Sequence, residues 1–476
     1  MSQPMHPAAS SDVDNASGSP NQARMPLPVP VPASAALSPV GEYILLALMV
    51  FFYSLPFLLN DQPHSMVSIK EMGITSPEGS PAKQFILAAM YSAGGIALLP
   101  RLDARARAAL SLPLIALLLW IFASAGWSDA GAVTLRRAVA LTGTLVFGHY
   151  LALCMPPQRL VRFICMLAVA VMTASFCVAL MLPQYGMDLE GRLRGVFAHK
   201  NSLAIFAALG IVCAAAGIFS MKQTLQSSRL YWLAGLFCVA GLVFSRSASP
   251  LSGVLAAILV MWHLHRQPAQ RSHWLTTVVC VLLMLGIVLL PLLASDLGEL
   301  AKAFGRSTDF SGRTLVWKFS LSFIERRPWS GYGYTSFWNG PAALMFTHWG
   351  GFPVPHSHNG ALQLALDCGL IGLLLFLWLL KRIVSGLHAG LNGVRRIELA
   401  WLAGFLVLYL FANFAETHLM EANDPYAALL AYCAFWLNLQ RTAAAPASLP
   451  AQANGDPPGA NTPPPNQNFS DSVTTP

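Results

Sequence analysis

Two histidines separated by one residue, His356 and His358, stand directly before a long apolar segment at residues 360–380. A histidine can accept a proton from a hydroxyl group near neutral pH. The first turn of a helix presents unpaired N–H groups and the positive end of its dipole, which favour an anionic ligand. This pattern indicates proton transfer beside an anionic substrate. The alternative is that Asn359 or Ser357 only caps the helix and that the histidines are solvated.

Two polar clusters earlier in the chain also border apolar segments. GRLRGVFAHKNSLA carries Arg194 and the consecutive residues His199, Lys200 and Asn201, and FSRSASPLSG carries Arg246. Arginine presents a planar fork of N–H donors that matches the oxygens of a phosphate group. These clusters are therefore candidates for binding an anionic substrate, and attraction to lipid phosphates is the alternative.

Two more clusters follow. SGRTLVWKFSLSFIERRPWSGYGYTSFW places Arg313 and Trp317 one helical turn apart, and NFAETHLMEAND carries Glu416 and His418. Tryptophan and tyrosine rings offer faces on which sugars stack, although they also form the aromatic belt of membrane proteins. Glu416 could orient a histidine or hold a substrate hydroxyl, or it could be a solvated loop residue.

Composition decides the class of protein in which these clusters stand. The chain has 476 residues, of which 55% are hydrophobic and 11% charged, and its mean hydropathy is +0.55. Soluble globular proteins carry about a quarter charged residues, so we expect a polytopic membrane protein. Its net charge of +8 is typical of basic loops beside membrane helices and does not indicate nucleic-acid binding. The 8 cysteines form no CxxC pair and predict no disulfide framework or zinc site.

The apolar segments predict an all-α fold with about 12 transmembrane helices and one large loop, residues 295–358. Residues 1–40 and 441–476 are rich in small and polar residues and predict disordered tails, which leaves 41–440 as the transmembrane domain. The expected spans are 42–60, 84–100, 108–126, 138–155, 163–182, 202–219, 230–244, 251–265, 275–294, 360–380, 397–415 and 424–440.

Basic residues set the predicted orientation. If both tails are cytoplasmic, the inner loops hold most of the short-loop arginines and lysines, as the positive-inside rule expects. The opposite face is nevertheless unusually basic, and all four polar clusters lie on it. Arginines that topology disfavours need another reason, and binding an anionic substrate is the simplest.

These motifs in this order resemble the O-antigen ligase and polymerase superfamily of membrane glycosyltransferases. The resemblance covers roughly residues 190–420 and rests on HKN, SRS, GRTLVW, GYGY and the HN that precedes GLIG. GRLRGVFAHKN and NFAETHL are more similar to the exopolysaccharide-polymerase (ExoQ-like) branch than to the lipopolysaccharide-ligase branch. The resemblance implies a GT-C-like fold in the bacterial inner membrane, with the large loop and the active site in the periplasm.

The resemblance also implies the reaction and the roles of individual residues. A glycan on undecaprenyl diphosphate is transferred to a sugar hydroxyl without a metal, a cofactor or a nucleotide sugar. His358 would be the catalytic residue that assists the hydroxyl, and Arg246, Arg313 and Arg194 would bind the diphosphate. The other candidate site residues are His356, Asn359, His199, Lys200, Asn201, Trp317 and Glu416. His356 departs from the family pattern, which leaves open which of the two imidazoles is the base.

We therefore predict a polymerase of lipid-linked repeat units in exopolysaccharide or O-antigen biosynthesis, with membrane lipids and other polysaccharide-export proteins as candidate partners. One alternative is a ligase that moves a finished glycan to lipid A-core or to a protein. An alternative of a different class is a transporter or flippase, which would place its charges near the bilayer midplane on broken helices.

Overall fold

The structure, a computed structural model, describes residues 38–58, 81–219, 225–266, 277–293, 312–391 and 396–444. In these residues the fold is all-helical, with one isolated bridge between Met187 and Leu193 and no strand, which confirms the all-α part of the predicted fold class. The predicted tails lie outside the described residues, except that the first and last helices extend slightly into them. The same holds for 295–311 of the predicted large loop.

A helix lies at each of the predicted apolar ranges. The helices are α1 (Pro39–Leu58), α2 (Pro81–Leu98), α3 (Ala104–Ala108), α4 (Leu112–Ala123), α5 (Gly131–Cys154), α6 (Pro157–Met181), α7 (Pro183–Gly186), α8 (Lys200–Phe219), α9 (Leu225–Ser245), α10 (Ala248–Arg266), an unlabelled helix Thr277–Leu293, α12 (Arg313–Ile324), α13 (Pro341–Gly350), α14 (Gly360–Leu391), α15 (Arg396–Ala412) and α16 (Pro425–Ala444), with short 3-10 turns at Leu99–Arg101, Ser124–Gly126 and Phe337–Asn339.

Five of these helices are long and apolar enough to cross a membrane: α5, α6, α8, α9 and α14. Four shorter helical stretches are also apolar, at Pro39–Val50, Leu112–Gly126, Thr277–Leu293 and Glu398–Ala412. The chain is thus a multi-pass membrane protein. The number of crossings and the side on which each loop lies stay predictions.

Several helices begin earlier than the hydropathy pattern predicted, among them α5 and α6. α5 starts at Gly131 and α6 at Pro157, whereas we expected 138 and 163. The added first turns contain Arg136, Arg137, Arg159 and Arg162, whose charges lower the local hydropathy without preventing a helix. Arg136 and Arg137 therefore lie in α5 and not in the loop before it.

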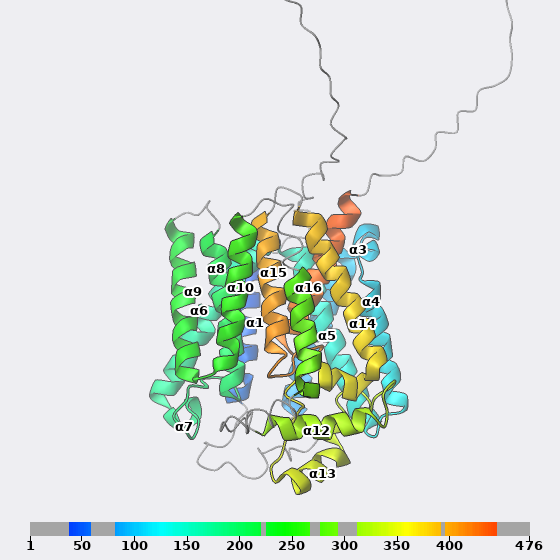
Figure 1. Ribbon diagram of the computed structural model, residues 1–476. Coiled ribbons are helices and arrows are strands. Elements are labelled where there is room, and N and C mark those ends of the chain that lie inside the picture. The colour runs from blue at the N-terminus through cyan, green and yellow to red at the C-terminus, as the bar shows by residue number, and fades with distance from the viewer. Residues whose placement is uncertain are drawn as a thin grey trace, which may run out of the picture. The chain divides into compact units, whose positions relative to one another are not determined.

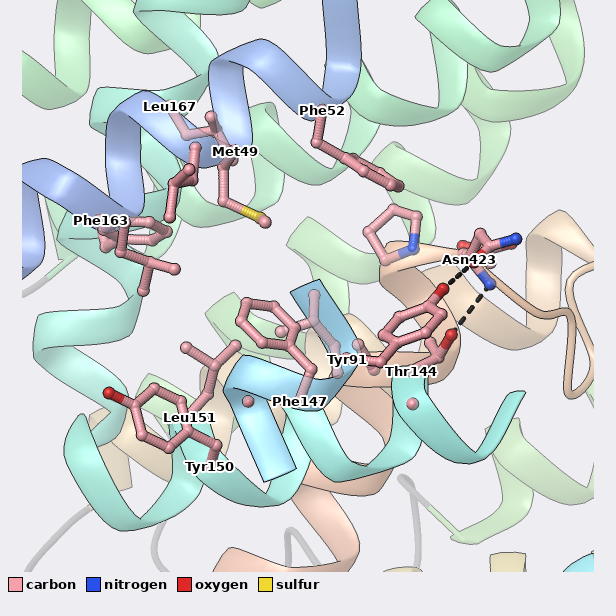
Figure 2. A pocket seen from close by; sticks show the side chains of 18 of the residues that line it. Met49, Phe52, Tyr91, Thr144, Phe147, Tyr150, Leu151, Phe163, Leu167 and Asn423 are labelled. Carbon is pink, nitrogen blue, oxygen red and sulfur yellow. Dashed lines mark hydrogen bonds between the residues drawn. The ribbon is translucent and has the colours of Figure 1, made fainter. Parts of the chain in front are cut away.

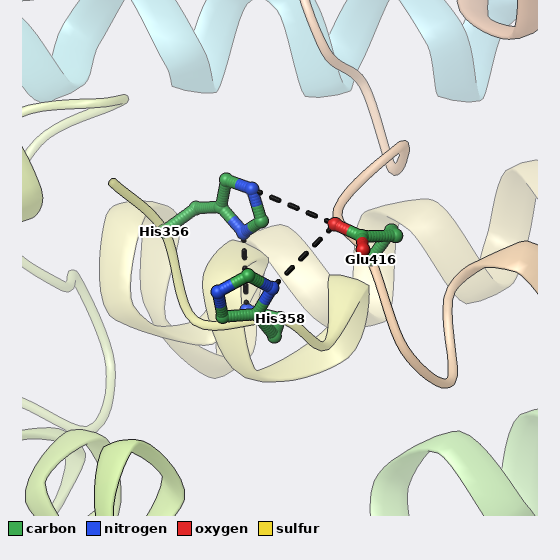
Figure 3. A group of neighbouring side chains, drawn as sticks. All are labelled: His356, His358 and Glu416. Atoms are coloured by element: carbon green, nitrogen blue, oxygen red, sulfur yellow. Dashed lines mark hydrogen bonds and ion pairs between the residues drawn. The ribbon is translucent and has the colours of Figure 1, made fainter. Parts of the chain in front are cut away.

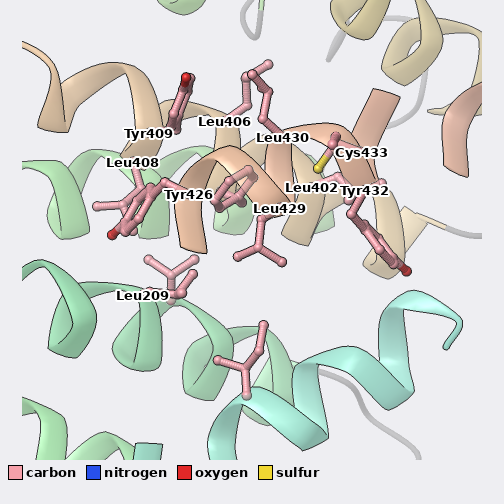
Figure 4. Packing of buried hydrophobic residues seen from close by; sticks show 14 of the residues in the cluster. Leu209, Leu402, Leu406, Leu408, Tyr409, Tyr426, Leu429, Leu430, Tyr432 and Cys433 are labelled. Carbon is pink, nitrogen blue, oxygen red and sulfur yellow. The ribbon is translucent and has the colours of Figure 1, made fainter. Parts of the chain in front are cut away.

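The core of the bundle is formed around α8, α15 and α16. Along α15 nearly every residue from Leu399 to Leu410 is buried, and Figure 4 shows tyrosine, leucine and cysteine side chains filling the space between these helices. Small residues let the helices approach closely, since a Cβ at Gly148 of α5 would lie 2.1 Å from the carbonyl oxygen of Ala428 in α16. Seven of the eight cysteines are buried here or nearby.

The helix α14 is broken at Gly369, whose φ of 67° and ψ of −172° are not helical. The segment 328–333 binds into this break. Tyr332 and Gly333 donate their N–H groups to the carbonyl oxygens of Leu366 and Asp367 (2.8 and 2.9 Å), and Leu370 donates to the carbonyl oxygen of Pro328 (2.7 Å). The GYG turn thereby fixes the first part of α14, which directly follows the two histidines.

Two short helices pack together at one end of the bundle. Figure 1 shows α12 and α13 at the end opposite to α3. A cluster of aromatic side chains holds them to each other, with Phe319 of α12 near Trp338 and near Phe346 of α13. The described part of the predicted large loop is thus a packed helical layer beside the histidine segment.

Candidate active site

His356 and His358 point to the same side of the chain and face one carboxylate, that of Glu416 (Figure 3). The distances to its Oε2 atom are 3.6 Å from Nε2 of His356 and 3.5 Å from Nδ1 of His358. His358 has a φ of +50°, which is uncommon for a residue other than glycine. Such strain is maintained only where the surroundings hold the backbone firmly.

The contacts of Ser357, the residue between the two histidines, fix this backbone. Its side chain is fully buried, and its N–H and hydroxyl groups both donate to Oε1 of Gln363 (3.0 Å each). Trp317 donates its Nε1–H to the carbonyl oxygen of Ser357 (3.1 Å), and Trp338 donates its Nε1–H to the hydroxyl (3.0 Å). The backbone between the two histidines is therefore fixed by α12, the turn after it and α14.

The second oxygen of Glu416 gathers the other predicted clusters. Its Oε1 atom accepts from the side-chain amide of Asn201 (2.6 Å) and from Nη2 of Arg313 (3.4 Å). Ser247, the neighbour of Arg246, donates in turn to Oδ1 of Asn201 (3.3 Å). Glu416, with 13% of its side chain exposed, thus joins HKN, SRS, GRT and HSHN, which are far apart in sequence.

The charges of this group follow from burial and from the neighbours. Burial would raise the pKa of Glu416, but the contact with His358 and the charges of the histidines and Arg313 outweigh it and hold that pKa below its ordinary value. Burial and repulsion from His358 lower the pKa of His356, although Glu416 opposes them. At neutral pH we therefore expect an ionised Glu416 beside a neutral His356.

A hydrogen bond assigns different roles to the two imidazoles. The backbone N–H of His358 donates to Nδ1 of His356 (3.2 Å), so the proton of a neutral His356 is on Nε2 and faces Glu416. His356 then has no free lone pair. His358 faces Glu416 through Nδ1, and if Nδ1 carries the proton, its Nε2 is free to accept one. The assignment of His358 as the base stays a prediction, and this geometry agrees with it.

The remaining predicted residues lie in distinct surroundings. Nδ1 of His199 accepts from the N–H of Asn201 (3.2 Å), and Lys200 is the first residue of α8. Arg194 is 5% exposed and donates to the carbonyl oxygens of Tyr185 in α7 (2.7 Å) and of Ala198 before α8 (3.2 Å), so at least two of its N–H groups hold the backbone on either side of it. A diphosphate-binding role for Arg194 stays a prediction.

Two other predicted site residues, Asn359 and Trp317, make contacts that give each of them a structural role. Asn359 is fully buried and caps α14, since its Oδ1 accepts from the N–H of Leu362 (3.0 Å) while its amide donates to the carbonyl oxygen of Ile287 (2.9 Å). Trp317 is 2% exposed and therefore buried, not part of an aromatic belt. Through their hydrogen bonds both residues position the histidine segment, and none of these bonds joins them to Glu416.

The three groups in Figure 3 are also of the types that bind metal ions, and one ligand atom from each lies within 4.8 Å of the others. To bind a metal through Nε2, His356 would need its proton on Nδ1, where it would meet the N–H of His358. The guanidinium of Arg313 also lies against the same carboxylate. These residues therefore fit a hydrogen-bonded cluster better than a metal centre.

The second half of the NFAETHLMEAND connection carries a pair for which the sequence pattern indicates no role. There, Nδ1 of His418, two residues beyond Glu416, bonds to the carboxylate of Asp424 in a partly buried pair. Burial would lower the pKa of His418, but Asp424 outweighs it and raises that pKa. Gln363, which links Ser357 to Asp367 of α14, was also missed, because only the fold brings it beside the histidine segment.

Comparisons with known proteins agree with the resemblance seen in the motifs. Residues 233–377 match the O-antigen ligase family. The chain is 25% identical over 349 residues to the exopolysaccharide production protein ExoQ of Rhizobium meliloti (strain 1021), which covers 68% of this chain and 78% of that protein. It is 29% identical over 120 residues to a provisionally named polysaccharide ligase of Rickettsia felis, which covers 23% of this chain and 29% of that protein. These matches confirm the predicted O-antigen ligase and ExoQ-like resemblance.

Proposed function

We propose that this chain, whose residues 233–377 match the O-antigen ligase family, polymerises oligosaccharide repeat units carried on undecaprenyl diphosphate at the periplasmic face of the inner membrane. The family acts on polysaccharides as ligases or polymerases, so the chain is a glycosyl-transfer enzyme in the general sense. The similarity to ExoQ, over 68% of the chain, favours exopolysaccharide polymerisation.

The observation that carries the proposal is the convergence on Glu416. A base candidate, His358, and a diphosphate-binding candidate, Arg313, lie at the same carboxylate, although they come from different segments. A lipid diphosphate is an activated leaving group, so glycosyl transfer from it needs a base for the incoming hydroxyl and cations for the departing anion. The cluster supplies both.

In the proposed reaction, the acceptor hydroxyl passes its proton to Nε2 of His358 while its oxygen bonds to the anomeric carbon of the donor sugar. The bond between that carbon and the diphosphate oxygen breaks, and the diphosphate leaves with the electron pair. Arg313 and Arg246 stabilise its charge, and ionised Glu416 stabilises the imidazolium that forms on His358. No metal or nucleotide sugar is required in this scheme.

A ligase is the second candidate. The matched family and the Rickettsia felis relative both carry ligase names. A ligase would use the same donor and the same base but would transfer a finished glycan to lipid A-core or to a protein. The family match favours either of these over the transporter that the sequence also allowed, because it indicates glycosyl transfer.

The glycan phenotype of a deletion strain separates the two candidates. A polymerase mutant should accumulate single repeat units on the lipid carrier, and it should regain long chains when the parent gene is restored. Long carrier-linked chains that never reach an acceptor would instead identify a ligase, and a normal glycan profile would contradict both.

A further inference from the structure

An apolar groove of about 470 Å³ lies within the helical bundle, lined by α1, α2, α5, α6, α8 and α16. Figure 2 shows aromatic and aliphatic side chains, among them Phe147, Phe163 and Met49, along its walls. On α5 the lining runs from Gly143 to Leu151, which corresponds to about 12 Å at 1.5 Å per residue. Leu48, which also lines it, is 46% exposed, so the groove reaches the surface of the bundle.

Polar groups gather near one end of this groove. The hydroxyl of Tyr91 bonds to the side chain of Asn423, and the N–H of Asn423 donates to the hydroxyl of Thr144 (2.9 Å) (Figure 2). Asp424, the next residue, also lines the groove, and its carboxylate holds His418. The groove thus ends against the same connection, residues 413–424, that carries Glu416.

We propose that this groove binds the isoprenoid chain of the lipid-linked donor, with its diphosphate directed toward the connection that carries Glu416. This inference rests on the function proposed above. Apolar walls with polar groups at one end match an amphiphile with a single long chain. The polar end meets the connection that carries Glu416, because Asp424 lines the groove and its carboxylate bonds to His418, two residues from Glu416. This position favours the lipid-linked substrate over bulk phospholipid as the occupant.

Two adjacent glycines in α2 provide a matched test. Gly94 lines the groove, and a Cβ there would have no atom within 4 Å. Gly95 is equally free of neighbours but is not among the lining residues. Gly94→Phe should therefore fill the groove without disturbing the helix, and Gly95→Phe is its control, since both changes replace a glycine in the same turn by the same side chain.

The purified full-length protein would be assayed in nanodiscs with the same repeat unit on a long polyprenyl diphosphate and on a short one. We expect Gly94→Phe to raise KM for the long-chain donor about tenfold, which corresponds to about 1.4 kcal/mol, and to reduce the preference for the long chain. Gly95→Phe should keep the parent's preference. Equal behaviour of the two variants would overturn the groove as the chain site, whereas an inactive parent would contradict the proposed function instead.

A binding measurement that does not depend on turnover completes the test. A polyprenyl diphosphate with a photoreactive group near the end of its chain should label the α5 peptide that contains Phe147 in the parent and in Gly95→Phe, but not in Gly94→Phe. Unlabelled polyprenyl diphosphate should displace the probe. Displacement by phospholipid with the same efficiency would show that bulk lipid occupies the groove and would overturn the proposal.

Discussion

Arg313 and Arg246 differ in what surrounds their guanidinium groups. Arg313 begins α12 and lies 3.4 Å from Glu416, whereas Arg246 is exposed and has no hydrogen-bond or ion-pair partner for its side chain among the described residues. Arg246 also has a φ of +51°, which turns the chain between α9 and α10. Both side chains can therefore contact a bound anion, Arg313 from within the group of residues around Glu416 and Arg246 from the edge of that group.

Replacing either arginine by lysine keeps the charge but removes the paired N–H geometry that fits a diphosphate. We expect Arg313→Lys and Arg246→Lys each to lose most of the transfer activity, measured as polymer formed at equal protein level. Arg326→Lys is the control, because Arg326 is exposed and lies over the ring of Phe323. If both lysine variants match the parent, the arginines serve topology or lipid contact.

The pair formed by His418 and Asp424 predicts a pH-dependent stability. Burial alone would lower the pKa of His418, but Asp424 raises it above the ordinary value. The folded state then binds this proton more tightly than the unfolded state. The stabilisation is complete below about pH 6.5 and is lost as the pH rises through the folded-state pKa.

Asp424→Asn tests this dependence and keeps an oxygen that can cap α16, where Oδ1 accepts from the N–H of Tyr426 (2.7 Å). The difference in Tm between the parent and this variant should be largest near pH 6 and should shrink toward pH 9. A difference that does not change with pH would show that the pair contributes through packing and not through the charge of His418.

At the scale of the elements, the break in α14 holds the histidine segment in place. A Cβ at Gly369 would lie 2.1 Å from the carbonyl oxygen of Trp329, and the φ of this residue is +67°. Gly191 has a similar φ of +69°, but a Cβ there would have no atom within 4 Å. A substitution at Gly191 therefore measures the cost of the positive φ alone, and the same substitution at Gly369 adds the cost of a steric clash.

Gly191→Ala should cost about 1 to 2 kcal/mol, and Gly369→Ala about 2 to 5 kcal/mol, because the second change adds overpacking to the same strain. The measurement is thermal unfolding of the detergent-solubilised protein. We also expect Gly369→Ala to lower activity, since it displaces the start of α14. Equal losses in the two variants would mean that the segment 328–333 can move aside without cost.

Hydropathy was sufficient to locate the long apolar helices, but not their polar ends or interruptions, nor the short helices α12 and α13 within the predicted large loop. The first turns of α5 and α6 were missed because arginines lower the local average, and the break at Gly369 was missed because GLIG reads as a continuous apolar run. The sequence did name His356, His358, Arg313, Asn201 and Glu416. It could not show that the other four residues meet at the carboxylate of Glu416, because those contacts depend on how α8, α12, α14 and α15 pack.

At the scale of the whole molecule, orientation in the membrane is the main prediction. We expect α12 and α13 in the periplasm and α3, at the opposite end of the bundle in Figure 1, in the cytoplasm. Leu344 of α13 is 55% exposed, and Ala108 ends α3. Cysteines at these positions, in a background without the exposed Cys177, would report the two sides.

In intact spheroplasts, Leu344→Cys should react with a membrane-impermeant thiol reagent and Ala108→Cys should react only after lysis. The parent with Cys177→Ala is the control for labelling of the buried cysteines. The opposite pattern would reverse the orientation and place the candidate active site in the cytoplasm.

The assignment of His358 as the base is the central claim, and one assay of purified protein tests it most directly. Parent, His358→Ala and His356→Ala would be supplied with lipid-linked single repeats, and the length and amount of carrier-linked glycan would be followed over time. Loss of a positioned general base costs about 10² to 10⁴ in rate, whereas His356 contacts only the backbone of His358 and the carboxylate of Glu416 in this account. We predict that His358→Ala loses chain growth by that factor and that His356→Ala retains more of it; the reverse ranking, or normal growth in both variants, would contradict the account.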